Sequence, residues 1–107
     1  MRDVVHVRDV ARANVLACEA VVSGGVPAGP LAAYNVCSGT PVRLLDVATE
    51  LSAATGTGLT PVVSGRYRLG DVRHIVASPR LAAAELGFKA GTGPHEGLRA
   101  FAHEPLR

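Results

Sequence analysis

The chain has 107 residues, of which 48% are hydrophobic and 19% are charged, and its formal net charge is +2. This composition is typical of a globular protein and argues against disorder, while so mild a charge gives no support for a nucleic-acid or membrane partner. No apolar leader follows Met1 and no apolar segment reaches the roughly 18 residues of a membrane-spanning helix, so we expect a cytoplasmic protein.

The first third of the chain predicts a strand, a helix and a second strand. Residues 4–7 form a short β-branched run, which is typical of a strand. Apolar residues recur at helical spacing over 8–22, and Asp9 suits the positive end of such a helix. A loop rich in glycine and proline follows at 24–30, and residues 31–36 then predict the second strand.

The middle of the chain predicts another helix, a third strand and a polar loop. An apolar stripe over 44–54 predicts an amphipathic helix, which Gly56 is suited to end in the left-handed conformation. Residues 60–64 predict the third strand, and residues 72–76 could extend into a short fourth one.

The last part of the chain predicts two short helices. Ser78 and Pro79 are suited as the N-cap and first residue of a helix that ends at residue 86, and a final helix is predicted over 94–103. This order of elements predicts an α/β fold with short strands and about four helices. Nothing in the sequence marks a boundary inside residues 1–107, so we expect one domain.

Cysteines and histidines form no recognisable chemical motif. Cys18 and Cys37 lack metal-ligand spacing, and we interpret both as reduced thiols in packed positions. The four histidines have no partner at ligand spacing, so no metal site is expected. The sequence also contains no G-x-G-x-x-G dinucleotide turn, no P-loop and no G-x-S-x-G nucleophile elbow.

An arginine-rich loop at 66–74, RYRLGDVRH, carries the most distinctive chemistry. Guanidinium groups present paired donors that match phosphate oxygens, and a carboxylate can accept hydrogen bonds from a ribose diol. The loop therefore suits a nucleotide diphosphate. A solvated charged loop, in which Asp71 pairs weakly with an arginine, is the open alternative.

Four segments, in order along the chain, resemble the NAD-dependent epimerases and dehydratases of the extended short-chain dehydrogenase/reductase family. They are RDVVHVRDVA at 2–11, YNVCSG at 34–39, the loop at 66–74, and the helical segments within 81–98. The resemblance is closest to nucleotide-sugar epimerases. It implies that the chain is the C-terminal, substrate-binding part of such an enzyme, with a dTDP- or UDP-sugar as its ligand.

The resemblance also implies roles for particular residues. Arg2 and Arg68 would hold the diphosphate from two sides, and Asp71 would contact the ribose. Secondary candidates are Arg66, Arg73 and His74.

Two positions depart from the family's pattern. Cys37 stands where the family usually has glycine, so its Cβ could crowd a close backbone approach or a positive φ. Arg43 stands where a capping serine is expected, which removes an N-cap worth about 1 kcal/mol.

The family's reaction passes a hydride to NAD and uses a tyrosine with a lysine four residues later. The residues four after Tyr34 and Tyr67 are Ser38 and Asp71, and Lys89 is the only lysine. We therefore expect a partial domain without the NAD-binding Rossmann half, holding no catalytic residue and no cofactor, that binds its ligand without turnover alone. Two alternatives stay open: an interaction module that docks to a partner carrying the cofactor domain or self-associates through an exposed apolar face, and a gene remnant.

Overall fold

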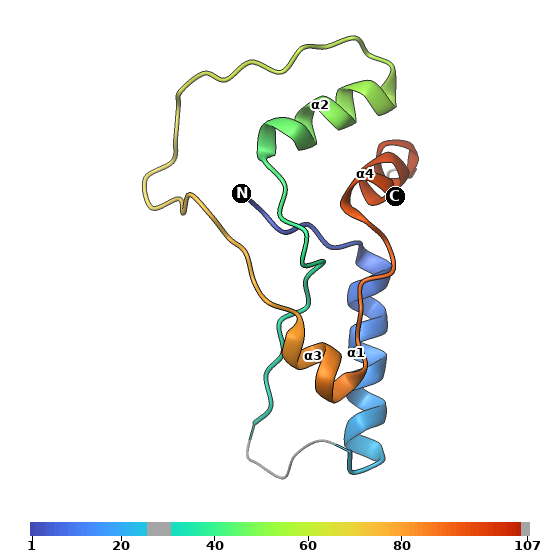
Figure 1. The fold of residues 1–107 in the computed structure, drawn as a ribbon. Helices are drawn as coiled ribbons and strands as arrows, with labels where there is room; N and C mark the ends of the chain where they lie inside the picture. The colour runs from blue at the N-terminus through green and yellow to red at the C-terminus, as the bar shows by residue number, and fades with distance from the viewer. Residues whose placement is uncertain (26–30, 106–107) are drawn as a thin grey trace.

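A computed structural model describes residues 1–25 and 31–105 of the protein, which form four helices (Figure 1). These helices are α1 (Val7–Val22), α2 (Leu44–Thr55), α3 (Arg80–Leu86) and α4 (Pro94–His103). Helix α2 packs against α4 at one end of the molecule, and α1 packs against α3 at the other. The molecule is thus built from two helix pairs joined by extended segments.

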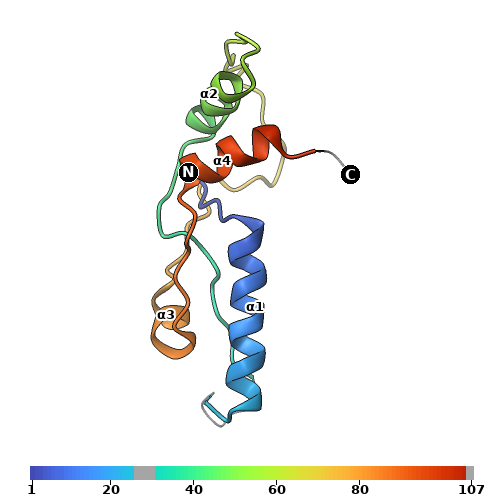
Figure 2. The same cartoon turned by 90° about the vertical axis from the view of Figure 1, so that its right-hand side faces the viewer.

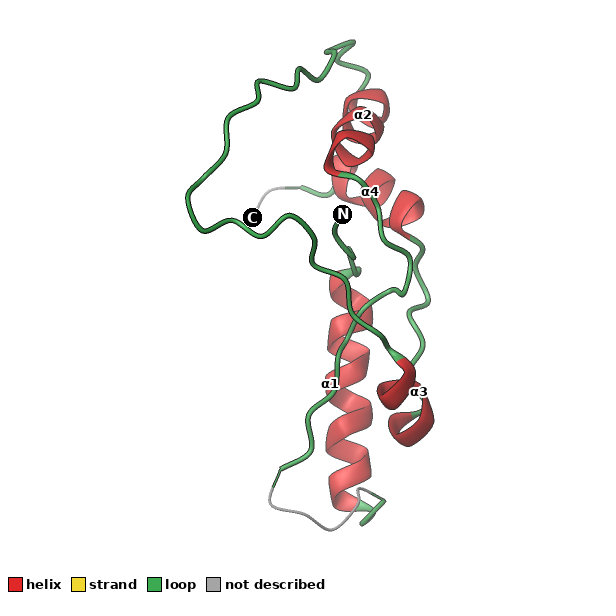
Figure 3. Cartoon of the chain, turned by 60° about the vertical axis from the view of Figure 1, so that its left-hand side comes forward, coloured by secondary structure: helices red, strands yellow, loops and turns green. Residues whose placement is uncertain are grey.

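The predicted α/β fold is wrong, because the described residues form no strand or sheet (Figure 3). The segments expected as strands at 4–7, 31–36, 60–64 and 72–76 lie in loops, except that Val7 already begins α1 and Ile75 forms an isolated bridge. Pairing is limited to two isolated bridges, in which Arg2 lies between Val42 and Ile75.

These bridges do not grow into a sheet because each segment soon enters another structure. Arg2 and Val42 exchange backbone hydrogen bonds at 2.9 and 2.8 Å. The backbone N–H of Thr40, the next that could join the pair, donates instead to Ser38 Oγ at 3.1 Å, and α2 begins at Leu44. Since a strand is stabilised by its paired neighbours, a β-branched sequence without them stays extended and unpaired.

The four predicted helices are confirmed, with small differences at their ends. Gly56 ends α2 with a φ of 65°, as expected. Arg43 is its N-cap and makes no side-chain capping bond, also as expected; both Nε and Nη2 donate at 2.8 Å to Asp46 instead. For α3 the predicted cap is wrong by one residue, because Pro79 is the N-cap and Ser78 lies before it.

A small core lies between α1 and α3. Its buried residues are Ala13, Ala82, Leu86 and Phe88, with Phe88 completely enclosed.

Cys37 is buried outside this core, as predicted. No non-glycine residue among those described has a positive φ, so a cysteine at position 37 is accommodated without the strain considered above. Burial, followed by the nearby Asp3 carboxylate, raises the pKa of the Cys37 thiol. Cys18 is exposed on α1, so its predicted packing is wrong.

The molecule is elongated for its length. Its radius of gyration is 16.9 Å and its extents are 51 × 32 × 24 Å, whereas a compact domain of this size has a radius of about 13 Å. The chain between α2 and α3 arches away from the helices in Figure 1. Of the predicted loop at 24–30, residues 26–30 lie outside the described part. No helix in the described residues is both long and apolar enough to cross a membrane.

Candidate functional site

Arg2 fastens the N-terminal segment to the arginine-rich loop. Its Nη1 donates to the carbonyl oxygens of Met1 at 3.0 Å and Arg73 at 3.2 Å, and its Nη2 donates to the carbonyl oxygen of Val72 at 2.8 Å. Nη2 also lies 4.0 Å from Asp71 Oδ1. The guanidinium therefore holds the loop by its backbone, 70 residues along the chain.

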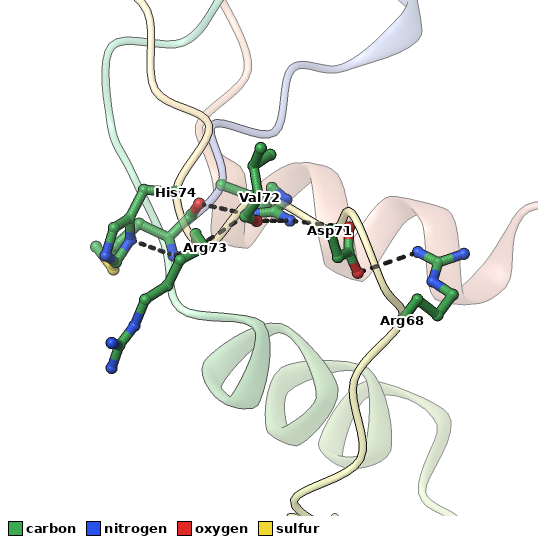
Figure 4. A network of polar contacts seen from close by, with 7 residues as sticks. Arg68, Asp71, Val72, Arg73 and His74 are labelled. Carbon is green, nitrogen blue, oxygen red and sulfur yellow. Dashed lines mark hydrogen bonds and ion pairs between the residues drawn. The ribbon is translucent and has the colours of Figure 1, made fainter.

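Arg68 pairs with the other oxygen of the same carboxylate (Figure 4). Its Nη2 donates to Asp71 Oδ2 at 3.4 Å, and the backbone N–H of Asp71 donates to the carbonyl oxygen of Arg68 at 3.1 Å. This backbone bond closes a four-residue turn in which Gly70 has a φ of 82°, a value that type II turns need at their third position and that favours glycine. The turn places Arg68 beside Asp71, which also lies near Arg2. The binding role that the resemblance implied for these three residues stays a prediction.

The secondary candidates do not join this group. The guanidinium of Arg73 points away from Asp71 in Figure 4. His74 Nδ1 lies 3.1 Å from the Met1 amino group instead. Among the described contacts, Arg66 takes part only through its backbone N–H, which donates to Ser64 Oγ at 3.3 Å.

The site is an open surface whose three side chains differ in freedom. The Arg2 side chain is 22% exposed, Asp71 44% and Arg68 89%. An exposed ion pair is worth only about 0–1 kcal/mol, so Arg68 can leave Asp71 for another anion at little expense. Three of the five N–H donors of Arg2 already bind carbonyl oxygens, so Arg2 has fewer donors left for an anion than Arg68 has.

Asp3 braces this site, a role that the sequence did not reveal. Its Oδ1 accepts hydrogen bonds from the backbone N–H of Ser38 at 2.7 Å and from Ser38 Oγ at 2.6 Å, and its Oδ2 accepts one from the Gly39 N–H at 2.9 Å. The turn after residue 36 is therefore tied to the residue next to Arg2. Asp3 and Ser38 are 35 residues apart in the sequence. Their contact depends on the fold, so residue spacing does not predict it.

Asp9 is a second anchor and, unlike Asp3, it is buried. Its full role was missed. It lies in the first turn of α1, as predicted, yet its carboxylate accepts hydrogen bonds from the backbone N–H groups of Gly91 at 2.9 Å and Thr92 at 3.0 Å. Arg12 Nη2 donates to Oδ1 at 3.2 Å. A Cβ at position 91 would lie 3.3 Å from Oδ1, so glycine allows this close approach. Asp9 thus ties α1 to the segment that leads into α4.

An apolar groove lies beside this anchor and away from the arginine-rich loop. Its volume is about 360 Å³. It runs between the N-terminal segment and α4, and is lined chiefly by Val4, Val5, Pro94, Leu98 and Phe101. A groove of this character suits an apolar side chain or helix better than a phosphate.

The described residues do not fit NAD. A dinucleotide site needs a glycine-rich turn between a strand and a helix, with several N–H groups aimed at the pyrophosphate. Residues 1–25 and 31–105 include no strand. Gly93 is the only glycine N-cap among the four helices, and the next residue is Pro94, which has no N–H.

Comparison with known proteins shows that the chain is similar to UDP-glucose 4-epimerases, in agreement with the resemblance of its motifs. It is 31% identical over 96 residues to a UDP-glucose 4-epimerase of Caenorhabditis elegans and 34% identical over 96 residues to the UDP-glucose 4-epimerase uge1 of Schizosaccharomyces pombe. Each match covers 90% of this chain. A bifunctional UDP-glucose 4-epimerase and UDP-xylose 4-epimerase 3 of Arabidopsis thaliana is 31% identical over 99 residues, or 92% of the chain.

The chain spans only 26–27% of the length of these curated relatives. It matches a C-terminal portion of the UDP-glucose 4-epimerases, which confirms the predicted resemblance. No protein-family model matches the chain, and no solved structure matches it significantly.

Proposed function

We propose that this chain is the nucleotide-sugar-binding portion of an NAD-dependent epimerase, an isomerase acting in the cytoplasm on a UDP- or dTDP-sugar. In this proposal residues 1–107 are one partial domain, and the cofactor is bound elsewhere. Arg2 and Arg68 hold the diphosphate, and Asp71 accepts hydrogen bonds from the ribose. The observation that carries the proposal is the convergence of these three side chains from two distant segments, in a chain related to UDP-glucose 4-epimerases.

The charges at the site support an anionic ligand. Two guanidinium groups flank one carboxylate, which leaves a local excess of one positive charge. Arg68 is almost fully exposed and makes one long ion pair, so its remaining N–H donors can form a charge-assisted pair of bonds with a phosphate. Asp71 would then be released by Arg68 while it stays near Arg2. A ribose diol beside the diphosphate is a suitable donor for that carboxylate.

Calorimetric titration of the protein with UDP, dTDP and pyrophosphate tests this assignment. Binding of each ligand is expected, and Arg68→Ala should weaken it by about tenfold, since a charge-assisted bond to phosphate contributes roughly 1.5 kcal/mol or more. Arg43→Ala is the matched control, because Arg43 is also an exposed arginine paired with an aspartate three residues later. Equal heats for the wild type and Arg68→Ala would remove Arg68 from the site.

A second candidate function is that of an interaction module, which the elongated shape and the apolar groove favour. A partner carrying the cofactor domain would bind in the groove, and the complex would be more compact than the chain alone. Leu98→Asp places a charge in the groove and should abolish co-purification with a separately expressed cofactor domain of one of the relatives, whereas Arg68→Ala should not. Failure of the wild type to co-purify with the cofactor domain would contradict the interaction module and favour nucleotide binding.

A further inference from the structure

The position of Arg2 depends on a very short paired segment, which lies below α2 and above α1 in Figure 2. The backbone of Arg2 exchanges hydrogen bonds with Val42 at 2.9 and 2.8 Å, and the Asp3 N–H donates to the carbonyl oxygen of Ile75 at 3.2 Å. Each pairing is an isolated bridge. A single bridge does not specify its own register, which strands take from a buried face or from the geometry of a turn.

A slip of one residue would turn the wrong side chain toward the arginine-rich loop. Successive side chains of a β-paired segment point to opposite faces, so a slip exchanges the faces of Arg2 and Asp3. The Asp3 carboxylate would then approach Asp71, and two carboxylates repel each other. The Arg2 guanidinium would face the backbone N–H groups of Ser38 and Gly39, for which it has no acceptor. Both meetings are unfavourable.

The native register satisfies the turn that precedes Val42. The Asp3 carboxylate accepts three hydrogen bonds from Ser38 and Gly39 at 2.6–2.9 Å. Such charge-assisted bonds are stronger than neutral ones. Ser38 Oγ in turn accepts the N–H of Thr40 at 3.1 Å. The turn and the residue next to Arg2 are therefore held together by one carboxylate.

We propose that Asp3 is the positioning residue of the diphosphate site. By holding the turn, it sets the register in which Arg2 meets Val42 and directs its guanidinium toward Asp71. Asp3 itself does not touch the ligand in this arrangement. The ligand is that of the proposed function, on which this inference rests.

The proposal makes Asp3 act through Arg2 and not through Arg68. The contact of Arg68 with Asp71 lies within one four-residue turn, closed by the hydrogen bond from the Asp71 N–H to the Arg68 carbonyl oxygen at 3.1 Å. That contact does not depend on the register of the N-terminal segment. The effect of Asp3 on binding should therefore be coupled to Arg2 alone.

Calorimetric titration with UDP measures the consequence for binding. Asp3→Ala should weaken binding about fivefold, and by no more than Arg2→Ala does. Asp3→Asn should recover part of this loss. Its amide oxygen still accepts both bonds from Ser38, whereas its NH2 group cannot accept the bond from the Gly39 N–H.

Double variants test whether Asp3 acts through Arg2. In a chain that already carries Arg2→Ala, Asp3→Ala should cause no further loss of affinity. In a chain that carries Arg68→Ala, it should cause its full loss. Full losses in both backgrounds would contradict the proposed coupling, because a general weakening of the fold does not distinguish the two arginines.

Asp9→Asn is the matched control for Asp3→Asn. Asp9 also accepts hydrogen bonds from two consecutive backbone N–H groups, those of Gly91 and Thr92, away from the arginine-rich loop. With both variants folded by circular dichroism, Asp9→Asn should bind UDP as the wild type does. An equal loss in the two variants would show that any loosened anchor weakens binding, and the positioning role would be wrong.

Amide hydrogen exchange followed by NMR, without a ligand, separates this inference from the proposed function. The N–H groups of Arg2, Val42 and Ile75 each donate to a backbone carbonyl oxygen. Asp3→Ala should speed their exchange at least about tenfold while α1 keeps its protection. Unchanged exchange would overturn the role of Asp3, whatever the titrations give. Faster exchange in a protein whose wild type does not bind UDP would reject the nucleotide site and still support the register set by Asp3.

Discussion

Replacement of Asp9 by alanine is expected to lower the free energy of unfolding by about 3 kcal/mol. The carboxylate is 5% exposed and accepts three hydrogen bonds, two from the backbone of Gly91 and Thr92 and one from Arg12. Removal of one member of a buried charged network leaves its partners desolvated and unpaired, which costs about 3 kcal/mol or more. The junction between α1 and the segment before α4 should open.

Urea unfolding followed by circular dichroism measures this loss. Asp46→Ala is the control, since Asp46 is also an aspartate in the first turn of a helix that pairs with an arginine three residues away. Its side chain is 42% exposed and its partner remains solvated, so its removal should cost much less than the removal of Asp9. Equal losses in the two variants would show that the contacts of Asp9 with Gly91 and Thr92 contribute nothing.

The same carboxylate should make stability depend on acid. Burial alone raises the pKa of Asp9, but the hydrogen bonds from Gly91, Thr92 and Arg12 outweigh it, so its pKa lies below the usual value. A group with a lowered folded pKa contributes stability that is complete above its unfolded pKa, about 3.9, and is lost as the pH falls through the folded pKa. Unfolding at pH 7, 5, 4 and 3 should therefore show a decline below about pH 4, and that decline should be smaller in Asp9→Asn.

The helices were predictable because their signals are local. The apolar repeat of α2 and its stop at Gly56 lie within a dozen residues, and so do the Gly93 and Pro94 signals that begin α4. Strands depend on partners that the sequence does not name. The run at 60–64 has β-branched residues and remains unpaired, since no neighbouring segment supplies hydrogen bonds to it within the described structure.

The role of the candidate site in binding stays a prediction, and the sequence pointed to its residues better than to its contacts. The motif resemblance identified Arg2, Arg68 and Asp71, and the structure brings them together. The resemblance did not indicate that the Arg2 guanidinium donates hydrogen bonds to backbone carbonyl oxygens. Backbone acceptors carry no sequence signal, because every residue has one. The anchors Asp3 and Asp9 were missed for the same reason: most of their donors are backbone N–H groups 35 to 83 residues away.

Phe88→Ala is expected to destabilise the protein by about 3–5 kcal/mol, the usual range for truncation of a buried aromatic side chain. Gly87, with a φ of 65°, turns the chain at the end of α3 so that Phe88 folds back onto the core. The ring is completely buried, and the Arg12 guanidinium lies 5.6 Å from its centroid. Truncation therefore removes the largest side chain of the core, together with the ring on which the Arg12 guanidinium lies.

Thermal unfolding followed by circular dichroism distinguishes this effect from a general loss of aromatic surface. Phe101→Ala removes the same group from α4, where the ring is 67% exposed, and should lower stability by less than about 1 kcal/mol. With only four buried residues between α1 and α3, no neighbour is large enough to fill the space left by Phe88. The Phe88 variant should melt at a much lower temperature and with a broader transition, and comparable melting of the two variants would mean that this helix pair is held by contacts other than its core.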